Sequence, residues 1–389
     1  MTERLYYRDC YLRDFRARVV ETADNGRRVY LDRTAFYPTS GGQPFDTGTL
    51  DGANVIDVID EEERVAHIVD AAISPGEIAG QIHWPRRFDH MQQHSGQHLL
   101  SAVLEILFQI PTVSFHLGPE ACTIDVSAPS LAVGQLEQAE ERCMEIVAEA
   151  RPLAIAFEDA AGDLGLRKET QRSGTLRVVA IDGVDRSACG GTHVRTTAEI
   201  GPVLIRKTEK TRGNMRLEFV CGLRALRQAR SDFRTLQEIS RQLSAPANAT
   251  PALVAAQLER VKTLEKANHR LAAEGAQREG REQWAATAPD ADGIRRAVEH
   301  VGEQSAIDDT MRTRAQAFVA QGKAVFLAVS RNPAAVLLAT SADSGIHAGD
   351  RVKTAVAAAG GRGGGNQALA QGSLPATADL AALTSSLLI

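Results

Sequence analysis

The chain has 389 residues, a formal net charge of −5 and a pI near 6.1. Hydrophobic residues make up 43% and charged residues 24% of it, which excludes wholesale disorder and indicates several folded domains. The acidic balance excludes a strongly basic nucleic-acid coat protein, but it leaves room for a local basic surface.

The cysteine count and the apolar pattern bear on the compartment. Five scattered cysteines are an odd number, which is not a disulfide framework and fits a reducing environment. The charged first residues lack the apolar core of a signal peptide, and no window approaches 18 consecutive strongly apolar residues. We therefore expect a cytoplasmic protein that does not associate with a membrane.

The first part of the chain, residues 1–85, has the pattern of a β-rich domain. Apolar and alternating runs, such as residues 18–31, are separated by glycine-containing turns. The segment 34–50 (TAFYPTSGGQPFDTGTL) is too rich in glycine and proline to be a helix interior. Its backbone is therefore free to approach another group closely.

Residues 86–222 are predicted to form an α+β domain. Apolar residues recur at helical spacing over 89–107, and a second helix is expected over 131–150. Short strand-like runs lie between and after these helices.

The remaining chain divides into a helical and an α/β part. Residues 223–288 carry two apolar stripes at helical spacing, broken near Pro246 and Pro251, which predicts two long helices in an antiparallel hairpin. Residues 289–389 alternate between helical patterns and short apolar runs typical of buried strands, and they contain the glycine cluster 360–365 (GGRGGG).

The first chemical signal is a histidine series on the helix predicted at 89–107. His90, His94 and His98 are spaced four apart, so adjacent pairs lie on one face and can bind one ion. The outer two are about 12 Å apart along the axis and cannot share it. The spacing alone leaves two pairs open, 90/94 or 94/98.

A second signal lies about ninety residues later, in the sequence CGGTH. Cys189 and His193 flank two glycines, which allow the backbone to fold tightly so that both side chains face one point. Thiolate and imidazole are ligands that zinc prefers. The two motifs together predict one zinc ion bound by three histidines and one cysteine.

These motifs resemble a known family. HSGQHLL followed by CGGTH is similar to the bipartite zinc motif of the alanyl-tRNA synthetase editing domain and of its stand-alone form, the AlaX alanyl-tRNA editing proteins. FYPTSGGQPFDTGTL, VSFHLG, CTIDV and MRLEFVCGLRAL resemble the same family in the expected order. The C-terminal part resembles the DHHA1-type tail of the synthetase, which points to the long form of AlaX.

The resemblance implies a fold and a ligand set. The fold is α+β, with a β-barrel-like domain (1–85), a zinc editing domain (86–222), a helical hairpin (223–288) and a DHHA1-like domain (289–389). The implied ligands of a single Zn²⁺ are His94, His98, Cys189 and His193, which leaves His90 outside the first coordination shell.

The implied activity is hydrolysis of the ester between a wrong amino acid, chiefly serine and also glycine, and tRNA(Ala). Such an enzyme is needed because one methylene or hydroxyl group is worth only about 1–3 kcal/mol to the synthetase pocket. The family places Thr34 and Gln43 in the amino-acid pocket, with Thr34 bonding the serine hydroxyl. Gly41 and Gly42 would let backbone N–H groups approach the ester or the ribose.

Residues 201–230 contain a local excess of basic side chains, which predicts a phosphate-contacting strip. The residues proposed to bind tRNA are Arg206, Lys207, Lys210, Arg212, Arg216 and, in the glycine cluster, Arg362. That cluster lacks the Lys-Ser/Thr of a P-loop, so the reaction is expected to be ATP-independent. The sequence departs from the family at Ser373, where a second glycine is common. The family also suggests a homodimer through the C-terminal region.

Other functions remain open at this stage. One is an editing hydrolase for another tRNA, such as Ser-tRNA(Thr), because related threonine-editing domains share the two metal motifs. Another is a non-catalytic tRNA-binding protein with a closed structural zinc. A zinc protease is disfavoured because HSGQH lacks the glutamate of HExxH, and a DHH-type phosphoesterase because the Asp-His-His motif is absent.

Overall fold

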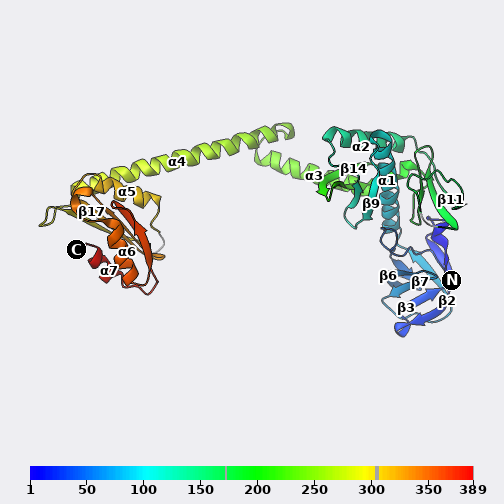
Figure 1. The fold of residues 1–389 in the computed structure, drawn as a ribbon. Helices are drawn as coiled ribbons and strands as arrows, with labels where there is room; N and C mark the ends of the chain where they lie inside the picture. The colour runs from blue at the N-terminus through cyan, green and yellow to red at the C-terminus, as the bar shows by residue number, and fades with distance from the viewer. Residues whose placement is uncertain (171–172, 303–305, 389) are drawn as a thin grey trace. The chain divides into compact units, whose positions relative to one another are not determined.

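The computed structural model describes residues 1–170, 173–302 and 306–388. Its contacts divide the chain into two compact units, Met1–Ile239 and Ser240–Ile389, which are described separately (Figure 1). Helices and strands are mixed in both, as the predicted α+β class requires. The four domain boundaries proposed from the sequence stay a prediction.

The N-terminal part of the first unit is a six-stranded barrel. Its strands are β2 (Asp14–Ala23), β3 (Arg28–Leu31), β5 (Gly48–Leu50), β6 (Ala53–Glu61), β7 (Arg64–Val69) and β8 (Glu77–Ile82). The pairing order is β2-β3-β7-β6-β5-β8, and β8 pairs back onto β2 to close the ring. Alternate side chains face inward, and Val29, Leu50 and Val65 are fully buried there.

A short parallel pair fixes the N-terminus beside this barrel. Strand β1 (Glu3–Arg4) pairs with β4 (Arg33–Thr34), and a 3-10 turn at Leu5–Tyr7 follows β1.

The long helix α1 (Trp84–Phe108) runs through the rest of this unit (Figure 1). It begins at Trp84 rather than near residue 89, because Pro85 is well suited to the first turn of a helix. Every residue from His90 to Leu104 is buried. The polar side chains in this stretch must therefore find partners inside the protein.

Two sheets and a second helix surround α1. One sheet has the order β14 (Val203–Thr211), β15 (Asn214–Cys221), β10 (Cys122–Val126) and β9 (Thr112–Leu117). The other consists of β11 (Leu153–Asp159), β12 (Thr175–Ile181) and β13 (Asp185–Ala188). Helix α2 (Val133–Ala148) contacts α1, and a 3-10 turn at Thr197–Ile200 contacts both helices. Apolar residues from all these elements form one core.

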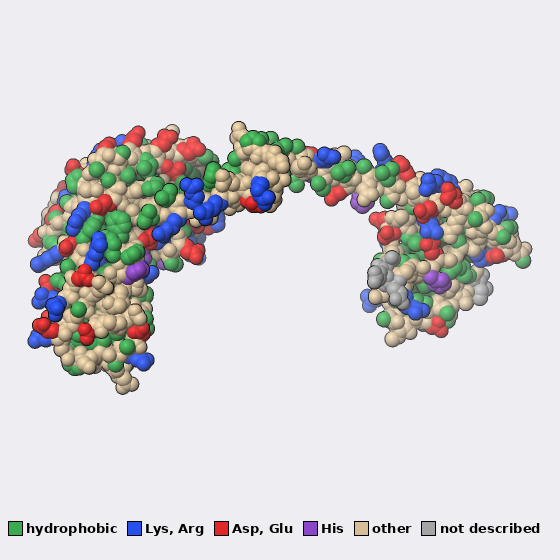
Figure 2. Space-filling view, turned by 180° about the vertical axis from the view of Figure 1, so that it is seen from behind, with side chains coloured by type: hydrophobic (Ala, Val, Ile, Leu, Met, Phe, Trp, Pro, Cys, Tyr) green, Lys and Arg blue, Asp and Glu red, His purple; other side chains and the backbone are tan. Residues whose placement is uncertain are grey.

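Two long helices follow, as predicted: α3 (Gly222–Gln242), in which the first unit ends, and α4 (Thr250–Ala286) in the second. The break between them contains a 3-10 turn at Ala247–Ala249, beside Pro246 and Pro251. Each helix exposes its apolar stripe, with Leu226 57% and Leu264 58% accessible. Figure 2 shows hydrophobic side chains on the surface of this helical region. Their antiparallel pairing stays a prediction.

The rest of the second unit is one mixed sheet with helices. The strand order is β16 (Arg295–Val301), β17 (Ala324–Arg331), β18 (Ala334–Thr340), β20 (Leu369–Ser373) and β19 (Arg362–Gly365). The helices are α5 (Asp309–Val319), α6 (Ala348–Ala358) and α7 (Leu380–Leu388). The glycine cluster is therefore largely an exposed strand rather than a loop.

No helix within the described residues is long and apolar enough to cross a membrane.

Candidate metal centre

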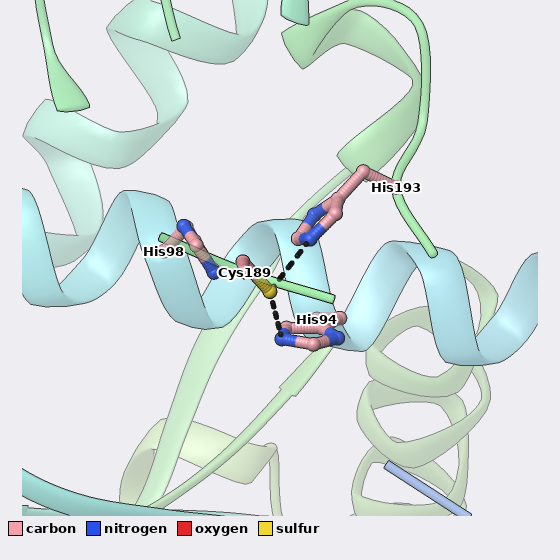
Figure 3. A group of neighbouring side chains, drawn as sticks. All are labelled: His94, His98, Cys189 and His193. Atoms are coloured by element: carbon pink, nitrogen blue, oxygen red, sulfur yellow. Dashed lines mark hydrogen bonds between the residues drawn. The ribbon is translucent and has the colours of Figure 1, made fainter. Parts of the chain in front are cut away.

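Four side chains from distant parts of the chain meet beside α1. His94 and His98 lie one turn apart on α1, and Cys189 and His193 lie on the segment that follows β13 (Figure 3). Their candidate ligand atoms all lie within 4.8 Å of one another. This grouping selects the 94/98 pair over 90/94, which the spacing of the histidines left open.

The cysteine sulfur is the centre of this cluster. Cys189 Sγ lies 3.4 Å from Nε2 of His94 and 3.3 Å from Nε2 of His193. Burial opposes ionisation, but the imidazoles of His94 and His193 lower the pKa of the Cys189 thiol well below its usual value. Burial also lowers the pKa of His193 to about 3, so this ring is neutral. Thiolate and neutral imidazole are the protonation states that bind a metal.

Each histidine is held through its other ring nitrogen. Nδ1 of His94 lies 2.9 Å from Oε1 of Gln43, Nδ1 of His193 lies 3.1 Å from Oγ of Ser95, and Nδ1 of His98 lies 2.8 Å from Oδ2 of Asp185. Such partners fix the ring orientation and leave Nε2 free to bind.

The partner of His98 is itself anchored. Burial lowers the pKa of His98, but the hydrogen bonds and negative charges of Asp185 and Cys189 together outweigh burial and raise that pKa to about 9. The other carboxylate oxygen of Asp185 accepts a 2.6 Å bond from Arg167, and Ser187 also donates to this carboxylate. The carboxylate therefore has its partners in place and can orient the imidazole.

The donor set fits zinc. Three imidazole Nε2 atoms and one thiolate are the nitrogen and sulfur ligands of this ion, and the outer hydrogen bonds match those of metal-binding histidines. His90 does not belong to the set; it is buried, and burial lowers its pKa to about 4.

One of the two glycines in CGGTH is required for steric reasons. A Cβ atom on Gly191 would lie 2.1 Å from Cε1 of His94 and 3.1 Å from Oε1 of Gln43. On Gly190 it would meet only Tyr7, at 3.7 Å. The second glycine of CGGTH therefore makes room for a metal-binding imidazole.

A pocket of about 540 Å³ opens beside the cluster. Two of the candidate ligands, His98 and Cys189, line it, together with Gly41 and the glycines of CGGTH. Its aromatic wall is formed by Tyr6, Tyr7, Tyr37 and Phe115, and its basic side chains are Arg4, Arg167 and Lys168. The site thus joins a buried metal-binding set to a cavity large enough for an aminoacyl group.

Comparisons with known proteins agree with this geometry. Residues 176–218 match the family described as the threonyl and alanyl tRNA synthetase second additional domain. The alanyl-tRNA editing protein AlaX-L of Pyrococcus horikoshii is 31% identical over 97% of this chain and 95% of its own length. The chain belongs to the AlaX family.

Other relatives match a smaller share of the chain. AlaX-M of Methanosarcina barkeri is 35% identical over 56% of this chain and 98% of its own length. The alanyl-tRNA editing protein Aarsd1 of Rattus norvegicus is 34% identical over 57% of this chain, and the match spans 60% of that relative.

The residues that the AlaX resemblance placed in the amino-acid pocket lie at different depths. Gly41 lines the pocket. Gly42 adopts φ +80°, and a Cβ there would lie 2.8 Å from the Phe115 ring. Gln43 is fully buried; it accepts from Thr192 N at 3.1 Å and donates to Thr192 Oγ1 at 2.9 Å, in addition to its bond with His94. Gln43 thus holds the His94 ring through its Nδ1 atom, on the side away from the candidate metal ligands.

Thr34 lies on β4, beside the barrel, and is fully buried. Its Oγ1 lies 2.8 Å from Nε2 of His67 and accepts a 3.1 Å bond from Phe36 N. A substrate hydroxyl would have to exchange with one of these partners to reach it.

The basic strip predicted on β14 and β15 is largely neutralised. Arg206 pairs with Asp232, Lys207 with Glu209, and Arg216 with Asp125. Lys210 and Arg212 have no ion-pair partner in the part of the chain that the structure describes, and Arg362 is exposed on β19. Figure 2 shows further basic side chains gathered over the start of α3.

Sequence reasoning missed the supporting residues of the centre. Asp185 and Arg167 belong to no motif, and Ser95 lies inside HSGQHLL without a spacing signal of its own. The structure supplies the missing reason: the stretch from His90 to Leu104 is buried, so each histidine in it requires a partner.

Proposed function

We propose that this AlaX protein hydrolyses the ester of mischarged tRNA(Ala), chiefly Ser-tRNA(Ala) and also Gly-tRNA(Ala). The observation that carries the proposal is the three-histidine, one-cysteine cluster at the wall of the pocket. The relatives named as alanyl-tRNA editing proteins support the same class of substrate.

The cluster would hold one Zn²⁺ through His94, His98, Cys189 and His193. When bound, zinc supplies Lewis-acid chemistry beside the scissile ester. Gln43, Ser95 and Asp185 would keep the three imidazoles in the tautomer and orientation that this requires. Four protein ligands also suit a closed structural site, so a non-catalytic zinc is the alternative to test.

The chain's own residues would provide the selectivity. The backbone of Gly41 lines the pocket, where an ester or a terminal ribose could approach it closely, and Gly42 would hold the turn beside it. Thr34 would form a hydrogen bond with the serine hydroxyl, a group that alanine lacks. A site built around that hydrogen bond rejects correctly charged Ala-tRNA far better than size exclusion does.

Deacylation of a substrate panel tests the function. Zinc-loaded protein should hydrolyse Ser-tRNA(Ala) and Gly-tRNA(Ala) faster than Ala-tRNA(Ala), with Ser-tRNA(Thr) included to test the other tRNA specificity. His94→Ala and Cys189→Ala should lose both zinc and activity. The matched control is His269→Ala, because His269 is exposed on α4. Protein that retains zinc and binds tRNA but leaves Ser-tRNA(Ala) intact would contradict the proposal and establish a structural ion.

A further inference from the structure

Four side chains from three segments lie in series on the first unit, as two neighbouring aromatic rings with an arginine at each end. The Arg13 guanidinium carbon lies 3.9 Å from the Trp84 ring centre, and that of Arg195 lies 3.9 Å from the ring centre of Tyr11. The Tyr11 and Trp84 ring centres are 5.3 Å apart. We name this series, Arg13–Trp84–Tyr11–Arg195, the arginine stack.

The two cations at its ends are exposed and only weakly neutralised. Within the described ranges no carboxylate pairs with Arg13. The Arg195 side chain is 64% accessible, and among the described residues its guanidinium group pairs only with Asp9, with 3.9 Å between Nη2 and Oδ1. The nearby carboxylate of Glu199 is occupied by the Tyr11 hydroxyl and by Arg195 N. The strip predicted at β14 and β15 differs, because its Arg206 and Arg216 already bind carboxylates.

The stack also positions the guanidinium groups. A ring that covers one face of an arginine leaves its N–H edge free and reduces the side-chain freedom that binding would otherwise cost. Planar edges of this kind match phosphate oxygens in bidentate contacts.

The arginine stack is connected to the metal centre through the backbone. Arg195 follows His193 by two residues, and the intervening Val194 N donates a 3.1 Å bond to Oγ of Ser95, the hydroxyl that holds His193. Tyr11 lies four residues after Tyr7, which lines the pocket. A ligand on the stack therefore lies on the same segments that form the site.

We infer that the arginine stack binds the phosphodiester backbone of the tRNA acceptor arm. The inference rests on the proposed function for the identity of the RNA. The exposed, weakly neutralised guanidinium groups and their planar N–H edges suit the phosphate oxygens of RNA, and an acidic peptide is an alternative outcome of the test.

The test uses full-length protein, uncharged tRNA(Ala) transcript and the variants Arg13→Ala, Arg195→Ala and their combination. Each substitution should weaken binding by roughly tenfold and lower the slope of log affinity against log salt by about 1. Hydrolysis of a small ester, seryl-adenosine, should stay unchanged because it carries no acceptor-arm phosphates. Arg13→Lys and Arg195→Lys retain the charge but lose the planar fork, so their binding should fall between wild type and the alanine variants.

The matched control is Arg64→Ala. Arg64 also covers an aromatic ring, with its guanidinium carbon 4.3 Å from the Tyr30 ring centre, but it pairs with Glu21 at 2.8 Å. It should leave tRNA affinity and the salt slope at wild-type values. Melting temperatures of all variants separate lost binding from lost folding.

The outcomes separate the two proposals. If the double variant binds tRNA with wild-type affinity and salt slope, the inference is overturned, whether the stack is purely structural or serves an acidic protein partner. Hydrolysis of Ser-tRNA(Ala) by the wild type would then still support the proposed function. If binding depends on the stack but no ester is cleaved, the RNA surface stands and the hydrolase fails.

Discussion

Nδ1 of His98 lies 2.8 Å from Oδ2 of Asp185, and both side chains are buried. The bond joins α1 to the start of β13, so it links the two halves of the metal motif. Arg167 and Ser187 complete the hydrogen bonds of the carboxylate. His98 is thereby held in one orientation before any ion binds.

Asp185→Asn keeps the size of the side chain but removes its charge, and it leaves Arg167 without its short ion pair. Zinc affinity should fall by about 10–100-fold, as is usual when a carboxylate behind a metal-binding histidine is changed. Competition with a chromogenic chelator measures it. Asp182→Asn is the control, because Asp182 is exposed three residues away. Equal zinc affinity in both variants would mean that Asp185 does not support the metal centre.

Adjacent glycines of CGGTH provide a second matched pair. Gly191→Ala places a methyl group 2.1 Å from the His94 ring, whereas Gly190→Ala places one 3.7 Å from Tyr7. We expect Gly191→Ala to displace His94 and lose most bound zinc, and Gly190→Ala to retain it. Zinc per chain is measured by atomic emission. Stoichiometric zinc in Gly191→Ala would show that the backbone can yield at this position.

The sequence predicted the metal ligands better than the residues that hydrogen-bond to those ligands. The two motifs identified the ligand types, and only the resemblance chose His98 over His90. Gln43 was expected to face the amino acid, yet it bonds His94, because the turn containing Gly41 and Gly42 directs it inward. Such directions depend on long-range packing between the barrel and α1, which a local pattern does not encode.

The ion pairs of the basic residues could not be predicted from the sequence either. The excess of basic residues at 201–230 was evident, but Asp232 and Asp125, which neutralise Arg206 and Arg216, come from α3 and β10. Conversely, Arg13 and Arg195 are isolated in the sequence and become neighbours of one aromatic pair only after folding.

Thr34→Val tests the pocket role that the family resemblance assigns to this hydroxyl. Loss of the hydroxyl leaves buried Nε2 of His67 without its partner and should destabilise the protein by about 1–3 kcal/mol. The preference for Ser-tRNA(Ala) over Ala-tRNA(Ala) should fall as well, measured as the ratio of kcat/KM values. Thr34→Ser, which keeps the hydroxyl, should retain that ratio. A lower melting temperature with an unchanged ratio would leave Thr34 with a structural role alone.

The exposed stripe of α4 has the pattern of a parallel two-stranded coiled coil. Its heptad a positions are Val254, Val261 and Asn268, and its d positions are Gln257, Leu264 and Leu271, so the apolar d positions begin at Leu264. Valine at a, leucine at d and one asparagine at a favour a parallel dimer. Arg260 and Glu265 then occupy g and e positions, where a parallel partner would pair them with opposite charge.

We therefore expect a dimer in solution and a monomer for Leu264→Glu, measured by sedimentation equilibrium. Lys266→Glu, on the outer face of the same helix, is the control and should remain dimeric. Arg260→Glu should weaken the dimer because it places like charges opposite each other, and adding Glu265→Arg should restore it. An intramolecular hairpin of α3 and α4 predicts the opposite, a monomeric wild type whose mass does not change in any of these variants. Restoration by the charge swap would exclude the hairpin, since only a second copy of α4 can present Glu265 to Arg260 in this register.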